Sequence, residues 1–200
     1  LLIPIIYLNV EHFTGIIILA CLAVISVGID LMMRYHSPTR RVLLALIGPI
    51  MRTHELNRDK LLLTGASWVL ISALVTMALF PTSVAVTAFT ILIVSDTFAA
   101  LVGRGVPGPR FLDKTLVGTS TFILTAWLVV AIYGNIYQMP WTYYVAGFIG
   151  SVLGGVVEAA SIRLKLDDNL SIPFSIATSM CLLGWLMMLM GHPNFFGAIP

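Results

Sequence analysis

Charged residues are scarce in this chain. Only 10% of its 200 residues are Asp, Glu, Lys or Arg, whereas 58% are hydrophobic, and the mean hydropathy is +0.99. A soluble domain carries about a quarter charged residues, so this chain could not cover a water-facing surface. The composition excludes a soluble globular protein and predicts an all-α, polytopic transmembrane helical bundle that forms a single integral membrane domain over residues 1–200.

Cysteine is also scarce. The two cysteines, Cys21 and Cys181, lie in apolar runs without a motif partner, so we expect small buried apolar residues and neither a disulfide nor a metal site. The four histidines are scattered without ligand spacing. The sequence has no serine elbow, no Cys–His arrangement and no nucleic-acid signature, which argues against a hydrolase of those types and against a nucleic-acid partner.

Long hydrophobic runs make up most of the chain. A helix that crosses a bilayer needs about 20 predominantly apolar residues. Six runs are predicted to span, with boundaries uncertain by a few residues: 13–33, 61–80, 83–102, 118–133, 142–162 and 170–191. The short apolar stretch 1–9 is interpreted as the end of a helix whose beginning lies upstream of this sequence.

The links between these runs alternate in charge. All 11 Lys and Arg lie in links 34–60, 104–117 and 163–169, and the other links and the tail have none. By the positive-inside rule the basic links, and with them the candidate site, face the cytoplasm, and the C-terminus lies on the opposite side. Segment 42–51 is apolar but too short to span, which predicts an interfacial or re-entrant helix. Arg52 follows it and could bind an anion or pair with the acid three residues on.

An intramembrane aspartate, Asp96, opens the stretch DTFAALVGR. Small residues follow it at i+3, i+4 and i+7 (Ala99, Ala100 and Gly103), so one helical face is acidic and then nearly smooth until Arg104. This face either packs against another helix, with Asp96 paired to a buried basic group, or lets the backbone approach a bulky anion. A carboxylate inside a membrane segment favours the functional interpretation.

The link after that helix combines irregular backbone with basic side chains. Gly and Pro predict a loop in GVPGPRFLDKTLVGTS, without a strand, and the loop carries Arg110 and Lys114. The next helix begins near Thr115 and Gly118, where exposed amides, a lysine and hydroxyls would form an anion site. The pattern is not a Walker A loop. The main support for an anion site here is that the loop directly follows the Asp96 face.

A second intramembrane acid, Glu158, ends another small-residue face. Close helix packing accounts for the glycines of that face but not for Glu158. The next link places Asp168 and Asn169 before the last helix, which either residue could simply cap. Asp96, Glu158 and Asp168 would then lie on one side of a bundle, and such oxygen ligands suit Mg²⁺ that is held partly by substrate phosphates.

Four blocks of this sequence resemble the CTP-dependent lipid-alcohol kinase family. They are MRTHELNRDKLLLTGASWVL, SDTFAALVGR, DKTLVGTSTF and VEAASIRLKLDDNLSIPF, in the family's order and over most of the chain. That family includes dolichol and polyprenol kinases, phytol and farnesol kinases, and the yeast-type diacylglycerol kinase. The resemblance implies transfer of the γ-phosphate of a cytoplasmic nucleotide, CTP, with Mg²⁺ as cofactor, to the hydroxyl of an isoprenoid alcohol in the lipid bilayer.

The resemblance also implies roles for the candidate residues. Asp96 would bind Mg²⁺ or orient the alcohol, and Glu158 with Asp168 would complete the metal or base set. The residues that would bind the nucleotide and its phosphates are Arg52, Gly103, Arg104, Arg110, Lys114, Thr115, Gly118 and Asn169.

The chain departs from the family pattern at two places. The family's Lys-Ser-x-Glu-Gly-Ser reads KTLVGT here, so Val117 stands where the family has glutamate, and the loop GVPGPRF lacks the usual Gly-Lys-rich form. Diacylglycerol kinase and a CDP-diacylglycerol synthase-like cytidylyltransferase are the alternatives, although the synthase signature Pro-Gly-His-Gly-Gly has no counterpart. A transporter or structural bundle whose acids form an ion relay is an alternative of a different class.

Overall fold

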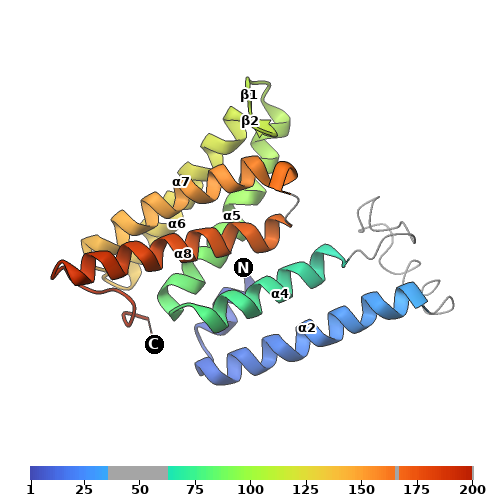
Figure 1. Cartoon of the computed structure of the whole chain (residues 1–200), viewed down its shortest axis with the longest axis horizontal. Helices are drawn as coiled ribbons and strands as arrows, with labels where there is room; N and C mark the ends of the chain where they lie inside the picture. The colour runs from blue at the N-terminus through green and yellow to red at the C-terminus, as the bar shows by residue number, and fades with distance from the viewer. Residues whose placement is uncertain (36–62, 165–166, 200) are drawn as a thin grey trace.

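The computed structural model describes residues 1–35, 63–164 and 167–199 (Figure 1). These residues form helices joined by short links, with one two-stranded hairpin. In chain order the elements are α1 (Leu2–Tyr7), α2 (His12–Tyr35), α4 (Gly65–Leu79), α5 (Thr82–Gly105), β1 (Arg110–Phe111), β2 (Lys114–Thr115), α6 (Leu116–Ile136), α7 (Trp141–Leu164) and α8 (Asp168–Leu189). The predicted all-α class is confirmed. The predicted helix at 42–51 and Arg52 lie outside the described residues.

Helices α5 to α8 form a closed four-helix bundle. Each contacts the next in the chain, and α8 returns to contact α5 (Figure 1). Helix α4 packs against α8 and α5, and α2 packs against α4. Helix α5 lies at the centre of this arrangement. Of an 18-residue apolar segment of α5, 61% is buried inside the protein, compared with 22% for the corresponding segment of α2.

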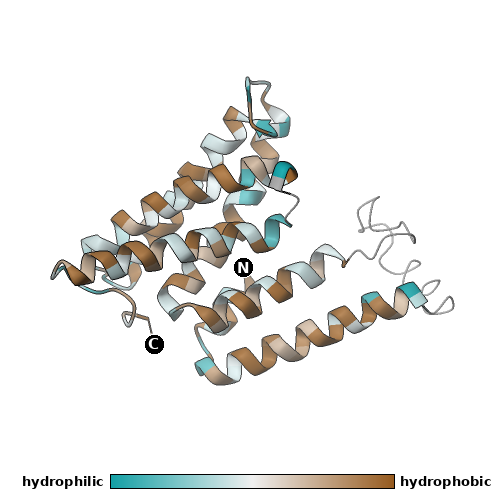
Figure 2. Cartoon of the chain, in the orientation of Figure 1, coloured by the Kyte–Doolittle hydropathy of each residue, from teal (hydrophilic) through white to brown (hydrophobic). Residues whose placement is uncertain are grey.

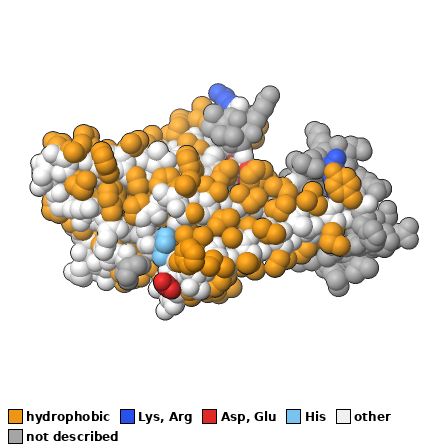
Figure 3. Space-filling model, turned by 60° about the horizontal axis from the view of Figure 1, so that its bottom comes forward, with side chains coloured by type: hydrophobic (Ala, Val, Ile, Leu, Met, Phe, Trp, Pro, Cys, Tyr) orange, Lys and Arg blue, Asp and Glu red, His pale blue; other side chains and the backbone are white. Residues whose placement is uncertain are grey.

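Within the described residues, five helices are long and apolar enough to cross a membrane: α2, α5, α6, α7 and α8. This length and composition support an integral membrane protein, and Figure 3 shows hydrophobic side chains over most of the face that it presents. The predicted span at 61–80 is different. Its described helix, α4, has 15 residues, about 22 Å of rise, whereas a bilayer core is about 30 Å thick. Thr64 caps α4 at its start, and Pro81 lies just beyond its end. The helix is therefore shorter than the apolar run from which the span was predicted.

The bundle has two chemically different ends. At one, which we call the hairpin end, β1 and β2 lie beside the last turns of α5 and α7 and the first turns of α6 and α8, and hydrophilic residues gather there (Figure 2). The opposite end is closed by the C-terminal tail. There the Thr142 hydroxyl donates to the Pro193 carbonyl (2.8 Å), the Ser83 hydroxyl donates to the Phe196 carbonyl (3.2 Å), and the Phe195 ring is fully buried.

A buried carboxylate joins α2 to α4. Asp30 Oδ2 accepts hydrogen bonds from the Thr64 backbone N–H (2.9 Å), the Thr64 hydroxyl (3.1 Å) and the Ser67 hydroxyl (2.6 Å). The Ser67 hydroxyl also pairs with that of Ser26 at 2.7 Å. Hydropathy alone gave no reason to single out Asp30, because its partners lie 34 and 37 residues away along the chain.

The two cysteines are free thiols, as expected from their isolation in the sequence. Their burial was predicted wrongly. Cys21 is exposed on α2 and Cys181 is half-buried on α8, because the surface of these helices faces lipid, where a small apolar side chain needs no cover.

Candidate functional site

The loop after α5 is an ordered hairpin, and here the prediction of a loop without strands was wrong. Arg110 pairs with Thr115 and Phe111 with Lys114 in two short antiparallel strands. The turn places Leu112 at φ +54°, in the left-handed region. A non-glycine residue there costs about 1–2 kcal/mol, and the absence of a Gly or Asn turn signal explains why the sequence did not reveal the hairpin.

The hairpin is fixed to α7 through Asp113. The Asp113 backbone N–H donates to the Ala159 carbonyl at 2.9 Å. Its carboxylate accepts from the Arg163 backbone N–H (3.0 Å) and from Arg163 Nε (2.9 Å). No sequence pattern indicated a role for Asp113, although the residue lies directly before Lys114 in the DKTLVGTSTF block.

Helices α5 and α6 cross closely behind the hairpin. The Thr115 hydroxyl caps α6 by accepting from the Gly118 N–H at 3.1 Å. A Cβ at Gly118 would lie 3.1 Å from that hydroxyl oxygen and 3.3 Å from the Ala99 carbonyl, and one at Gly103 would lie 3.3 Å from Gly118 Cα. The smooth face that follows Asp96 is therefore in part a helix contact, as one of the two interpretations required, and its residues Ala99, Ala100 and Gly103 also line a cavity.

A cavity of about 310 Å³ opens at this crossing. Small residues of α5 and α6 form one wall, and charged residues from the hairpin, α5 and α7 form the others. The lining consists of Ala99, Ala100, Gly103, Arg104, Arg110, Asp113, Lys114, Thr115, Gly118 and Glu158. Most of the predicted site residues thus border one cavity, although Gly103 and Glu158 lie 55 residues apart along the chain.

Lys114 lies at the electrostatic centre of this cavity. Its Nζ is 2.9 Å from Glu158 Oε1 and 3.7 Å from Asp168 Oδ2. Burial by itself would lower the pKa of Lys114, but the hydrogen bond and charge of Glu158, with the charges of Asp168 and Asp96, outweigh burial and raise that pKa. Lys114 is therefore protonated at neutral pH, and the three predicted carboxylates act on the same ammonium group.

Only one carboxylate oxygen of Glu158, Oε1, takes part in this ion pair. The residue is 3% exposed, and its Oε2 has no hydrogen-bond partner among the described residues. A buried polar atom without a partner is costly and rare. Since Glu158 also lines the cavity, the free oxygen is a candidate contact for a ligand.

Three predicted residues within the described ranges, Asp96, Asp168 and Asn169, are not part of the cavity lining. Asn169 donates from its backbone and side-chain nitrogens to Asp167 Oδ1, and Asp167 is the residue that caps α8. Neither Asp168 nor Asn169 is the cap that the sequence suggested. Val117, which stands where the family has glutamate, packs close to Gly108 of the loop.

The donor set is compatible with Mg²⁺ that arrives with phosphates. No group of three His, Cys, Asp or Glu side chains within the described ranges could hold a metal ion alone. Mg²⁺ commonly uses one or two carboxylates, water and substrate phosphate oxygens. The unpartnered Glu158 oxygen and the nearby Asp96 carboxylate, whose charge acts on Lys114, are ligands of the type that this cation prefers.

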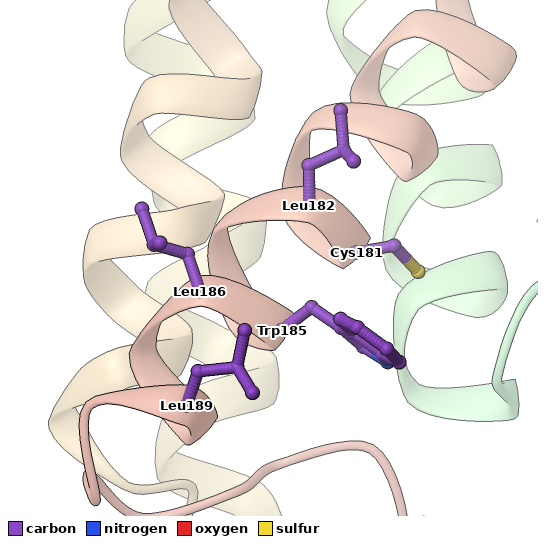
Figure 4. A pocket seen from close by; sticks show the side chains of 5 residues that line it. All are labelled: Cys181, Leu182, Trp185, Leu186 and Leu189. Atoms are coloured by element: carbon purple, nitrogen blue, oxygen red, sulfur yellow. The ribbon is translucent and has the colours of Figure 1, made fainter.

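A second hollow lies on the outer surface of α8, far along the helix from the hairpin end (Figure 4). Its volume is about 420 Å³, and its lining is formed by Cys181, Leu182, Trp185, Leu186 and Leu189. This groove is almost wholly apolar and faces outward, where lipid chains would fill it. It offers no group for acid–base or phosphate chemistry.

Comparison with known proteins identifies a similar protein but does not indicate an activity. No family model matches the chain, and no solved structure matches it. An uncharacterized protein of Rickettsia prowazekii (strain Madrid E) is 28% identical over 184 residues, which cover 92% of this chain and 89% of the relative. The similarity therefore extends over most of the length of both chains, and the cavity at the hairpin end is the feature from which a function must be argued.

Proposed function

We propose that this protein transfers the γ-phosphate of a nucleotide, CTP, to the hydroxyl of an isoprenoid alcohol in the membrane, and belongs with the CTP-dependent lipid-alcohol kinases. The observation that carries the proposal is the cavity itself. It combines the cations Arg104, Arg110 and Lys114 with a buried carboxylate at one end of an apolar bundle. A phosphate donor from water and a hydroxyl on a lipid can meet only at such a border.

In this proposal the cations hold the phosphates. Arg104 and Arg110 are exposed at the cavity and can reach a triphosphate from solvent. Lys114 then exchanges part of its contact with Glu158 for the γ-phosphate. Phosphoryl transfer needs positioning and charge neutralisation more than covalent help from the protein, and a set of fixed cations supplies both.

The carboxylates serve the acceptor and the metal. Asp96 and Glu158 would hold Mg²⁺, which would neutralise phosphate charge when bound. The alcohol oxygen forms a bond to the γ-phosphorus, the bond from that phosphorus to the β–γ bridging oxygen breaks, and CDP leaves. The hydroxyl proton passes to Asp168, the carboxylate of the cluster that is not assigned to the metal.

The basic links favour the cytoplasmic side for this chemistry, where nucleotides are available. A prenyl chain would lie along the apolar helix surfaces with its hydroxyl at the cavity. A cysteine-accessibility map of the hairpin and of the C-terminal tail in sealed vesicles tests this orientation. The tail is expected to be labelled from the side opposite to the hairpin.

The test of activity is a direct assay of the purified protein in lipid nanodiscs. CTP and ATP are compared as donors, with phytol, farnesol, a polyprenol and diacylglycerol as acceptors. We expect a phosphorylated isoprenoid alcohol with CTP. Pyrophosphate released from CTP and phosphatidate would instead establish a cytidylyltransferase, and solute flux without nucleotide would establish a transporter.

Asp96→Asn provides the matched control for the assay. The amide keeps the size of the side chain but removes the charge that binds the metal. We expect turnover to be lost while the variant inserts and folds like the parent. Retained turnover would contradict the role given to Asp96.

A further inference from the structure

Three hydrogen bonds around Asp113 join the hairpin to the last turns of α7. The Asp113 N–H donates to the Ala159 carbonyl, and the Asp113 carboxylate accepts from both the backbone N–H and Nε of Arg163, all at 2.9–3.0 Å. Ala159 and Arg163 are four residues apart, so Asp113 engages the two backbone groups that pair in a regular helix turn. The Asp113 side chain is only 15% exposed, whereas that of Arg163 is 62% exposed, so the junction lies at the edge of the bundle.

The bonded residues are the immediate neighbours of the charged pair. Lys114 follows Asp113 on the hairpin, and Glu158 precedes Ala159 on α7. The bond from Asp113 to Ala159 therefore connects the backbones that carry the two partners, whose Nζ and Oε1 are 2.9 Å apart. A lysine side chain has four rotatable bonds, and a fixed backbone origin is what limits where its ammonium group can lie.

We propose that Asp113 is the positioning residue of this site, because it sets the hairpin against α7 and thereby holds Lys114 beside Glu158. Asp113 borders the cavity but its carboxylate is already occupied by Arg163, so it acts through Lys114 rather than on a substrate. The proposal rests on the proposed function for its effect on kinetics. Its effect on the geometry of Lys114 is independent of that function.

The first experiment measures the placement of Lys114 without any assay of activity. The rate at which a water-soluble amine reagent modifies Lys114 is followed by peptide mass spectrometry in nanodiscs. We expect Asp113→Ala to raise that rate by on the order of tenfold, because an ammonium group released from its 2.9 Å contact with Glu158 is more open to the reagent and deprotonates more readily. Asp113→Asn, whose amide oxygen can still accept from the Arg163 N–H, should stay near the parent, and Arg163→Ala should be intermediate.

The second experiment separates positioning from stability. In the kinase assay Asp113→Ala should raise the KM for CTP by about 10- to 100-fold, with rescue in Asp113→Asn. The matched control is Asp30→Ala, which removes another buried carboxylate far along the chain from the hairpin. It should lower thermal stability yet leave the Lys114 modification rate and the KM unchanged.

The outcomes are distinct. Parent-like modification of Lys114 and a parent-like KM in Asp113→Ala would overturn the positioning role, and so would equal effects in Asp30→Ala. If Asp113→Ala does not fold, parent-like reactivity in Arg163→Ala overturns it. If the parent protein phosphorylates no alcohol, the proposed function fails, and the amine reactivity alone decides the role of Asp113.

Discussion

Asp30, between α2 and α4, and Glu158, at the hairpin end of α7, are both almost fully buried, but their neighbours differ in kind. Asp30 accepts from a backbone N–H and two hydroxyls, all neutral donors. Glu158 faces an ammonium group on one oxygen and has no hydrogen-bond partner on the other within the described chain. Asp30 borders none of the cavities described here, whereas Glu158 lines one.

The contrast in hydrogen-bond partners separates an acid that holds two helices together from an acid that is open to a ligand. Burial is equally costly for both carboxylates. Hydrogen bonds that also fix the start of α4 offset that cost for Asp30, so none of the described residues at this junction calls for a ligand. The ion pair with Lys114 offsets the burial cost of Glu158 only in part. Other charged groups can compete with Glu158 for that lysine.

The largest expected effect comes from removing the cation. Lys114→Ala leaves Glu158 buried without its partner, which should cost about 2–3 kcal/mol, less than a fully buried pair because Lys114 is partly exposed. Turnover should fall by at least about 100-fold. Both are measured on nanodisc samples, by thermal unfolding and by the kinase assay.

The double variant Lys114→Met/Glu158→Leu sharpens this result. Apolar replacement of a buried ion pair is often neutral for stability, so the melting temperature should return towards that of the parent. Turnover should not return. Recovery of both together would mean that the Glu158 cluster is structural, like that of Asp30.

Asp30→Ala should have the next largest effect, and only on stability. It removes the acceptor of three hydrogen bonds and should destabilise the protein by about 2–3 kcal/mol. Turnover per folded molecule should remain that of the parent. A selective loss of turnover without a change in melting temperature would break the comparison between the two acids.

Alanine substitutions at two glycines should have smaller effects on stability, and these effects should be opposite in sign. A methyl group at Gly118 meets the Ala99 carbonyl and the Thr115 hydroxyl, whereas one at Gly28 on α2 meets nothing within 4 Å. Gly118→Ala should cost about 1–2 kcal/mol and weaken CTP binding. Gly28→Ala should stabilise by about 0.5–1 kcal/mol, and paired unfolding curves test both signs.

The smallest effect is on pH dependence. The pKa of Lys114 is raised in the folded protein above its ordinary value of 10.5. Its contribution to stability is therefore fully present below pH 10.5 and is lost as the pH rises through the higher folded value. The parent should lose stability more steeply above that pH than Lys114→Met/Glu158→Leu, and parallel slopes would show that the pair contributes nothing.

Sequence alone predicted the helices and much of the site, because hydropathy fixes where apolar helices lie and acids within them are conspicuous. Asp96, Glu158, Asp168 and Lys114 could be grouped from the sequence, since the positive-inside rule predicts one side of the membrane for the basic links and the adjoining helix ends.

Other features were invisible for physical reasons. The hairpin places Leu112 in a conformation that its side chain does not favour, so no turn signal announces it, and the bonds of Asp113 depend on that hairpin. The partners of Asp30 are set by how α2 meets α4. The shortness of α4 follows from a cap that an apolar run does not reveal.

The closure of the four-helix ring has a consequence for biogenesis. Helices α4 and α5 leave the ribosome before α8, yet α8 contacts both of them and carries the acid beside Lys114. The hydroxyl of Ser83 likewise bonds to Phe196, 113 residues later. Until α8 inserts, the inner faces of the earlier helices are exposed to lipid and the site lacks one of its acids, so a chain that stalls before residue 168 is an incomplete bundle open to membrane proteases.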